Sequence, residues 1–264
     1  MQPDFSTPSV ARMHNYLIGG RDHFRPDREA CKQLLRIAPS TRDLALVNRA
    51  FLLRAVRYLA QECGVTQFID HGSGIPAQPN VHQVAQEINP RDARVVYIDN
   101  DPIVLGMGKM MLEEDTATTA VMLQDIRKTD AVFNSDDVRR LIRLDKPVAA
   151  LFVSVLHFIP AADDPWNLIR QTASRLPSGS YLVISQLASE DPQLRSDVAQ
   201  FMLDAAGGNW GDVRSPAEVA SFFDGLELVG AEAPCEVSRW HPDELGPRQR
   251  TTEWFGFGGV ARVP

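Results

Sequence analysis

The 264-residue sequence predicts an α/β protein: a doubly wound, mostly parallel sheet of seven strands preceded by an N-terminal helical cap. Three observations predict this fold. Short apolar segments alternate with helical patterns from residue 67 onward, as in parallel sheets covered on both faces. A turn containing two glycines follows the first apolar segment. Acidic residues follow the first, second and third segments, at the edge where such sheets bind ligands.

The first 64 residues predict only helices. Ser9 is a suitable N-cap for a helix over 10–18, which Gly19-Gly20 ends. A second helix is expected over 27–37. A third is expected over 42–63, because its apolar residues recur at spacings of three and four. We expect residues 1–64 to form a cap or lid and residues 65–264 to form the core of one domain.

The strands and the later helices are predicted from apolar runs and from the glycine, proline and capping residues that bound them. Strands are predicted over 67–70, 94–99, 119–123, 148–154 and 180–186, and helices near 79–90, 102–114, 135–143, 164–176, 191–205 and 216–223. The strand over 148–154 is the most continuously apolar, so it should lie centrally. Residues 225–229 and 252–262 are predicted to form an antiparallel hairpin at the sheet edge.

Composition limits the classes of partner. The net charge is −7, so there is no global basic field to attract nucleic acid. Three scattered cysteines without a C-x-x-C pattern predict a reducing compartment, no disulfide framework and no metal site. No apolar run is long enough to span a bilayer, and no signal pattern opens the chain. We therefore expect a cytoplasmic protein, and the oligomeric state stays open.

The glycine turn predicts a nucleotide site. Gly72-Ser73-Gly74 follows a strand, and Asp99 ends the next one, which is the layout of a β-α-β nucleotide-binding unit. The glycines allow backbone N–H groups to approach a ligand, and the acid accepts hydrogen bonds from ribose hydroxyls. The third glycine of a dinucleotide turn is missing. The acid-rich surroundings favour a cationic ligand without phosphate, so we favour S-adenosylmethionine over NAD.

The ligand edge of a doubly wound sheet selects the candidate residues. The predicted cofactor-binding residues are Asp70, His71, Gly72, Ser73, Gly74, Asp99, Asn100, Asp101, Gln124, Asp125, Ile126 and Ser154. We assign Asp99 to the ribose hydroxyls, Asp125 to the adenine amino group, and Gly72 and Gly74 to the methionine part. Each acid alone is equally typical of a helix cap or a solvated turn, and Asp101 before a proline resembles an N-cap.

Two further groups of residues are candidates for the reaction. His157 follows the fourth strand and is either a general base for methyl transfer or a packing residue under the ligand. The crowding of polar and aromatic residues near the first helix predicts a lid or a plain amphipathic cap. The candidate lid residues are His14, Asn15, Tyr16, Gly20, Arg21, Asp22 and His23.

Several stretches together resemble a known family. They are residues 11–24 with Asp27-Arg28, then 68–76, 80–82, 95–102 and 223–229. This combination is similar to the actinobacterial S-adenosyl methyltransferase family, once catalogued as a domain of unknown function. The resemblance covers nearly the whole chain and implies a Rossmann-like class I methyltransferase fold with S-adenosylmethionine at the turns named above. His71 departs from the small or aliphatic residue expected there.

The sequence thus predicts an S-adenosylmethionine-dependent methyltransferase with a small-molecule acceptor. Two alternatives remain open: a non-catalytic protein that binds S-adenosylmethionine as a sensor or partner, and an NAD-dependent oxidoreductase. The acidic net charge of −7 makes nucleic acid an unfavoured acceptor.

Overall fold

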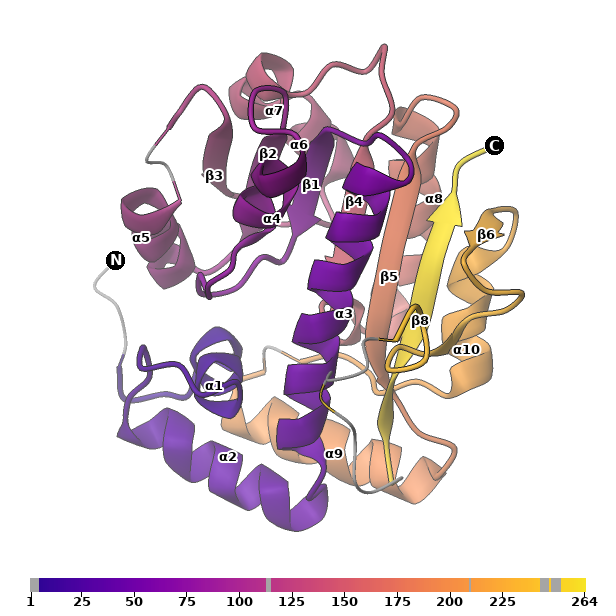
Figure 1. The fold of residues 1–264 in the computed structure, drawn as a ribbon. Helices are drawn as coiled ribbons and strands as arrows, with labels where there is room; N and C mark the ends of the chain where they lie inside the picture. Colours follow the sequence, from indigo (N-terminus) through magenta and orange to yellow (C-terminus); the bar gives the residue numbers. More distant parts are fainter. Residues whose placement is uncertain (1–4, 113–114, 209, 243–246, 248–252) are drawn as a thin grey trace.

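The computed structural model describes residues 5–112, 115–208, 210–242, 247 and 253–264, and within them an eight-stranded sheet carries helices on both faces (Figure 1). The strands are β1 (Gln67–His71), β2 (Arg94–Asp99), β3 (Thr119–Leu123), β4 (Ala149–Val153), β5 (Tyr181–Ala188), β6 (Glu227–Val229), β7 (Cys235–Glu236) and β8 (Phe255–Arg262). Their order is β3-β2-β1-β4-β5-β8-β6, and β7 pairs with β8 beside this path. The doubly wound α/β prediction is confirmed.

Strand directions place the ligand edge. β1 to β5 run parallel, whereas β8 is antiparallel to β5, β6 and β7. From β1 the chain adds β2 and β3 on one side and then continues with β4 and β5 on the other. The strand order therefore reverses between β1 and β4, where a doubly wound sheet opens a crevice at its carboxyl edge. The prediction that β4 lies centrally is confirmed.

The helices form two layers and a group beyond the carboxyl edge (Figure 1). One face carries α3 (Thr41–Gln61), α4 (Val81–Ile88) and α5 (Pro102–Met111), and the other carries α6 (Thr129–Phe133), α7 (Asp136–Leu141), α8 (Pro165–Arg175) and α10 (Pro216–Ala220). The third group consists of α1 (Val10–Leu17), α2 (Arg25–Ile37) and α9 (Pro192–Ala205), and short 3-10 helices cover Leu156–Phe158, Ala161–Asp163 and Ser221–Phe223.

The long helix α3 belongs to the sheet core and not to the cap alone. Its side chains Phe51 and Leu59 are fully buried in one cluster with Phe68 of β1 and Val95 of β2. Burying large apolar side chains in this way is the main favourable term in folding. The helical cap predicted for residues 1–64 is therefore divided: α1 and α2 stand beyond the strand ends with α9, and α3 covers a sheet face (Figure 1).

The largest differences from the predicted elements lie near the ends of the sheet. The predicted pair 225–229 and 252–262 is antiparallel, but β8 inserts between β5 and β6, so β6 forms the edge. The short strand β7 and the helix α6 are additional. Residues 113–114 and Thr252, which the sequence assigns to a helix and a strand, lie outside the described residues.

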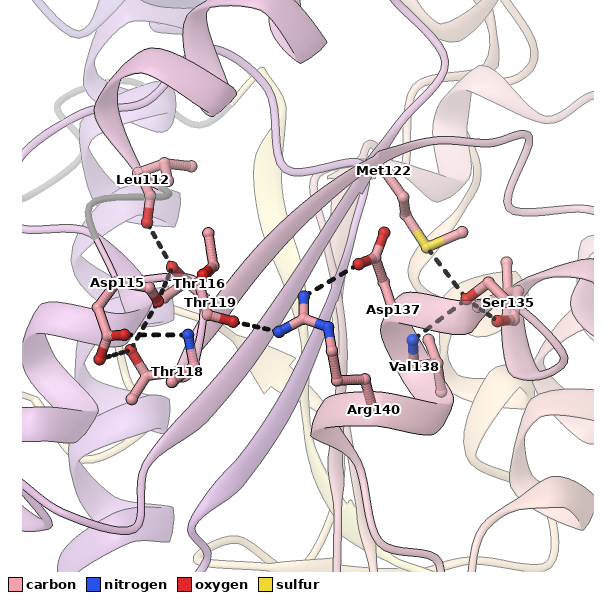
Figure 2. Close-up of polar contacts among 12 residues, drawn as sticks. Leu112, Asp115, Thr116, Thr118, Thr119, Met122, Ser135, Asp137, Val138 and Arg140 are labelled. Atoms are coloured by element: carbon pink, nitrogen blue, oxygen red, sulfur yellow. Dashed lines mark hydrogen bonds and ion pairs between the residues drawn. The ribbon is translucent and has the colours of Figure 1, made fainter.

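Side-chain hydrogen bonds secure the opposite, amino edge of β3 (Figure 2). Thr119 Oγ1 donates to the Leu112 carbonyl at 2.5 Å, and Arg140 of α7 donates to the Thr116 carbonyl. These bonds fix the start of the edge strand β3, at the end of the sheet opposite the crevice. No helix in the described ranges is long and apolar enough to cross a membrane.

Candidate functional site

A cavity of about 630 Å³ lies between the carboxyl ends of the strands and the helices α1, α2, α3 and α9. This volume is within the range of small-molecule sites. One part is lined by the loops after β1, β2, β3 and β4, and the other by apolar side chains of the cap. Every predicted cofactor-binding residue lines it except His71.

The glycine turn after β1 is built differently from a phosphate-binding loop. The N–H groups of Gly72 and Ser73 donate to the Ile98 carbonyl at 2.8 and 2.9 Å, and Gly74 N–H donates to Asp99 Oδ2 at 2.9 Å. The expectation that these N–H groups face the ligand is wrong, because β2 already uses them. Gly72 has a φ of +74°, and a Cβ there would lie 2.3 Å from Val155.

The rest of the turn leaves room for a ligand. Gly74 has a φ of +66°, and a Cβ added to it would meet no atom within 4 Å. The Ser73 hydroxyl is buried and has no hydrogen-bond partner among the described residues. A buried hydroxyl of this kind normally has a partner. The open space at Gly74 fits an adenosyl cofactor that contacts the turn through van der Waals surface.

Asp99 is the carboxylate most firmly positioned at the carboxyl edge. Its Oδ2 accepts from Gly74 N–H and its Oδ1 from Asp101 N–H, both at 2.9 Å. Burial raises the pKa of Asp99, and these backbone hydrogen bonds oppose that rise in part. Each carboxylate oxygen has two lone pairs, so both retain capacity for ribose hydroxyls.

Asp70 and Arg49 both line the cavity at the end near Asp99, and their charges interact. Burial raises the pKa of Asp70 to about 7, while the Arg49 charge lowers it in part and the Asp99 charge raises it further. Arg49 of α3 donates to the carbonyls of Ala77 and Pro79, and burial lowers its pKa. This end therefore offers an acidic group and a cation, which is the complement of an amino acid's ammonium and carboxylate.

Asp125 after β3 is engaged by a neighbouring arginine. The Arg127 guanidinium donates to both carboxylate oxygens of Asp125 at 2.7–3.0 Å and to Asp163 at 2.6 Å. Although burial alone raises the pKa of Asp125, the hydrogen bonds from Arg127 bring it below its usual value. Gln124 lines the cavity on one side of Asp125, and buried Ile126 supplies an apolar surface on the other.

The remaining residues of the carboxyl edge have mixed roles. Asp101 is the N-cap of α5: its Oδ1 accepts from Ile103 N–H at 2.8 Å and its Oδ2 from the Ser9 hydroxyl at 3.0 Å. Asn100 lines the cavity beside it. Ser154 also lines the cavity, in a left-handed conformation with a φ of 56°. A non-glycine residue held in this conformation is typical of ligand sites.

His71 does not line the cavity, so the structure separates it from the predicted set. Its ring is 1% exposed and stacks on Phe152 with the centroids 4.2 Å apart. Burial lowers the pKa of His71 to about 4. The side chain points into the sheet core because successive residues of a strand face opposite sides, and the ligand loop begins only at Gly72.

His157 lines the inner part of the cavity on the short helix after β4. Its ring lies 5.0 Å from the Trp210 ring, centroid to centroid. Burial lowers its pKa to about 3, and the charges of Arg214 and His14 add to this effect. Nδ1 of His157 and Nε1 of Trp210 are buried without hydrogen-bond partners in the described part of the chain.

Arg214 fixes the backbone on both sides of His157. The buried guanidinium donates to the carbonyls of Leu156 and Ile159 at 2.9 and 2.8 Å, and it lies 5.1 Å from the Trp166 ring centroid. A planar group with several donors suits this task, since it can bridge two carbonyls at once. Arg214 therefore positions the loop that presents His157.

Of the candidate lid residues, only His14 lines the cavity. Asn15, Tyr16, Gly20, Arg21, Asp22 and His23 shape the turn between α1 and α2 instead. Asn15 Oδ1 accepts from Asp22 N–H at 2.9 Å, and a Cβ on Gly20 would lie 2.4 Å from the Asn15 side chain. The Tyr16 and His23 rings pack edge to face.

The cap is anchored by a buried ion pair that sequence reasoning missed. Arg12 Nε donates to Asp27 Oδ2 at 2.9 Å, and both side chains are almost fully buried. Asp27 also accepts from the N–H groups of Ser9 and Phe24. Arg49, Trp210 and Arg214 were missed as well, because each reaches the site from an element distant in sequence. Arg49 lies outside the apolar face of its helix, so the periodicity of that helix gave no signal for it.

Comparison with known proteins gives a consistent result. A family model described as S-adenosyl methyltransferase matches residues 2–264. A crystal structure of a putative methyltransferase from Thermobifida fusca YX is 36% identical, with a TM-score of 0.89 and coverage of 98% of this chain and 96% of that one. A DUF574 family protein from Streptomyces avermitilis MA-4680 is 35% identical, with a TM-score of 0.88 and coverage of 99% of both chains.

A more distant structure shares the fold alone. An O-methyltransferase family protein from Burkholderia thailandensis is 13% identical, with a TM-score of 0.50, and the match covers 86% of this chain and 61% of that one. A search of the curated proteins found no match.

Proposed function

The chain belongs to the S-adenosyl methyltransferase family, and from this premise we propose that it methylates a small molecule enclosed in the inner part of the cavity. The protein is an enzyme that uses S-adenosylmethionine as its methyl donor. The observation that carries the proposal is the cavity of about 630 Å³, which continues from the strand-end carboxylates into an apolar compartment under the cap. A compartment of that kind gives an acceptor a dry place beside the cofactor.

The proposed cofactor contacts follow from the charges at the carboxyl edge. Asp99 accepts hydrogen bonds from the ribose hydroxyls, and the Ile126 side chain packs against the adenine beside Asp125. Asp70 faces the ammonium of the methionine part, and Arg49 faces its carboxylate. These pairings place each charge of the cofactor next to an opposite one, which is favourable in a buried site. Gly72, Ser73, Gly74 and Ser154 supply the surface between them.

The methyl transfer requires little covalent catalysis by the protein. S-adenosylmethionine supplies a methyl carbon on a positively charged sulfur, so the acceptor's lone pair bonds to that carbon while the carbon–sulfur bond breaks and its electron pair stays on sulfur. The protein's part is to hold the acceptor atom in line and to exclude water. Enclosure by α1, α2 and α9 serves both purposes.

His157 is the residue that we assign to the acceptor's proton. Because burial lowers its pKa to about 3, the imidazole is neutral and does not ionise an alcohol or phenol before the reaction. The acceptor's O–H becomes strongly acidic only as the new oxygen–carbon bond forms. His157 takes the proton at that point and then releases it to water, which leaves the ring neutral for the next cycle.

The two alternatives find less support. A dinucleotide would need the free N–H groups of the glycine turn, and those of Gly72, Ser73 and Gly74 are already used by Ile98 and Asp99. The helix α4 begins only at Val81, too far along the chain to direct its N-terminus at a pyrophosphate. A non-catalytic sensor needs no second, apolar compartment beside its ligand.

Isothermal titration with S-adenosylmethionine, S-adenosylhomocysteine and NAD tests the cofactor part directly. We expect both adenosyl compounds to bind and NAD not to bind. Binding of NAD alone would refute the proposed cofactor contacts. Soaking crystals with S-adenosylhomocysteine provides the second test: the ribose should lie within hydrogen-bond distance of Asp99, and the sulfur should face the cap. A sulfur directed toward bulk solvent would support the sensor.

A further inference from the structure

The inner compartment of the cavity has an apolar wall made by the cap. Met13 and Leu17 of α1, Leu34 of α2 and Met202 of α9 line it together with Trp254. These side chains are almost fully buried and form one core cluster. A ligand in contact with them exchanges water for apolar surface, so an apolar skeleton is favoured here.

The ionisable groups on this wall carry no charge near neutral pH. Burial lowers the pKa of His14 to about 4, with a further contribution from Arg49, and it lowers the pKa of His157 to about 3. Arg49 also lines the cavity, but its charge interacts with Asp70 and its guanidinium donates to two backbone carbonyls. A charged acceptor would therefore lose its hydration without gaining a counterion of its own.

The polar atoms on the wall suit a hydroxyl group. The His157 imidazole accepts a hydrogen bond in its neutral form, and the Trp210 indole can only donate. Both residues line the cavity, and their ring centroids lie 5.0 Å apart. A hydroxyl both donates and accepts, whereas a carboxylate only accepts and an ammonium only donates.

From these observations we infer that the methyl acceptor is a neutral, largely apolar small molecule that carries a hydroxyl group, and that its oxygen is the atom methylated. This inference rests on the proposed function, because it takes the inner compartment as the acceptor site. The hydroxyl lies against His157 and Trp210, and the skeleton lies against Met13, Leu34 and Met202. The oxygen's lone pair forms the bond to the methyl carbon, and its proton passes to His157.

The test uses the full-length protein saturated with S-adenosylhomocysteine and a matched panel of probes. Phenol and naphthol are compared with benzoate and naphthoate, and with benzylamine and naphthylmethylamine, by isothermal titration. We expect the hydroxyl compounds to bind at least about tenfold more tightly than the anion or cation with the same ring. The inference is overturned if no hydroxyl compound binds, or if a charged partner binds as tightly.

A variant of the wall provides an internal control. Met202→Lys places a cation in the compartment and should reverse the order, with naphthoate binding more tightly than naphthol, while the affinity for S-adenosylhomocysteine stays unchanged. Met202→Leu keeps the wall apolar and should retain the order seen in the unmodified protein. An unchanged order in Met202→Lys would remove this wall from the acceptor site.

The two levels of failure are distinguishable. If S-adenosylhomocysteine itself does not bind, the proposed function fails and the acceptor inference falls with it. If S-adenosylhomocysteine binds and the carboxylates bind as well as the hydroxyl compounds, only the acceptor inference is overturned. The comparison in the unmodified protein requires no variant to fold.

Discussion

Asp70 and Asp99 end neighbouring strands and line the same cavity, yet their surroundings differ. Two backbone N–H groups hold the Asp99 carboxylate in place, whereas Asp70 faces the charge of Arg49 without a hydrogen bond to it. Burial raises the pKa of Asp70 to about 7, which is close to physiological pH. Asp70 is the residue of the site whose charge changes most readily.

This property predicts that cofactor binding depends on pH. Between about pH 5.5 and about pH 7.5 the Asp70 carboxyl, with its pKa of about 7, passes from neutral to ionised as pH rises. The ionised form attracts the ammonium of S-adenosylhomocysteine, so the affinity should rise with pH, by at most tenfold per pH unit. Titration calorimetry across this range measures the slope.

The Asp70→Asn variant is the control for that slope. It removes the titrating group while keeping nearly the same shape, so its affinity should be lower at the upper end of the range and nearly constant across it. Arg49 keeps its charge throughout, and Asp99 stays in place. A slope that persists in Asp70→Asn would assign the titration to another group.

At the residue scale, sequence reasoning could locate side chains whose place is determined by their position along a strand. Asp70, Asp99 and Gln124 lie at the carboxyl ends of parallel strands, and these ends share one edge, so all three line the cavity. The reasoning failed for His71, where a one-residue difference turns the side chain from the ligand loop into the core. It also missed Arg49 and Arg214, whose roles depend on packing between distant elements.

Among the elements, the cap helices α1 and α2 are joined by the Arg12–Asp27 ion pair. Both partners are buried, and Asp27 also accepts two backbone N–H groups. A buried carboxylate with this many donors organises the start of each helix. The wall of the inner compartment, which includes Met13 and Leu17, depends on α1 staying in this position.

Removing one partner of this pair should destabilise the protein strongly. Asp27→Asn removes the carboxylate from a buried ion pair, which typically costs about 3–5 kcal/mol. Urea unfolding monitored by circular dichroism measures the loss. The matched control is Lys32→Ala in the exposed pair Lys32–Glu29 of the same helix, which should change stability little.

A double variant separates the pair from the surrounding structure. Arg12→Met combined with Asp27→Leu removes both charges and should recover a large part of the stability lost in Asp27→Asn. If Asp27→Asn is no less stable than the unmodified protein, the ion pair does not anchor the cap.

At the element scale, periodicity predicts most helices and parallel strands but not the order of the last strands. The apolar patterns of residues 67–70, 94–99 and 119–123 match β1, β2 and β3 closely. Nothing in the local pattern states that β8 inserts between β5 and β6, because that depends on long-range pairing. The short helix α6 is missed because five residues give too little periodicity.

For the whole molecule, three histidines with lowered pKa values, His14, His71 and His157, stand out among the titratable groups. Burial lowers the pKa of His14 and His71 to about 4 and that of His157 to about 3, from 6.5. When the chain unfolds, each recovers its ordinary pKa. Below about pH 6.5 the unfolded chain therefore binds protons that the folded protein does not, and stability falls as pH decreases toward 4.

Asp70 and Asp99 act in the opposite direction. Burial raises the pKa of Asp70 to about 7, so between about pH 4 and about pH 7 folded Asp70 binds a proton that the unfolded chain does not. Burial also raises the pKa of Asp99, so acidification favours folding through both groups. As pH falls, the destabilising effect of the three histidines opposes the stabilising effect of the two carboxyl groups. We expect a net loss of stability between about pH 7 and about pH 5, measured by urea unfolding at each pH.

The His71→Phe variant tests the origin of that loss. Phenylalanine keeps the stack on Phe152 but cannot titrate, so stability should fall less steeply with acidification than in the unmodified protein. Equal slopes in the two proteins would show that His71 is not a source of the acid sensitivity.

The central claim is that carboxylates at the ends of adjacent parallel strands hold the adenosyl cofactor, and calorimetric titration of Asp99→Ala with S-adenosylhomocysteine tests it most directly. The variant should lose at least about tenfold in affinity, as expected for the loss of a charge-assisted hydrogen bond of about 1.5–3 kcal/mol. Asp145→Ala removes an exposed carboxylate before β4, at the other edge of the sheet, and should bind like the unmodified protein. Equal affinity in Asp99→Ala and Asp145→Ala, with both variants folded by circular dichroism, would contradict the claim.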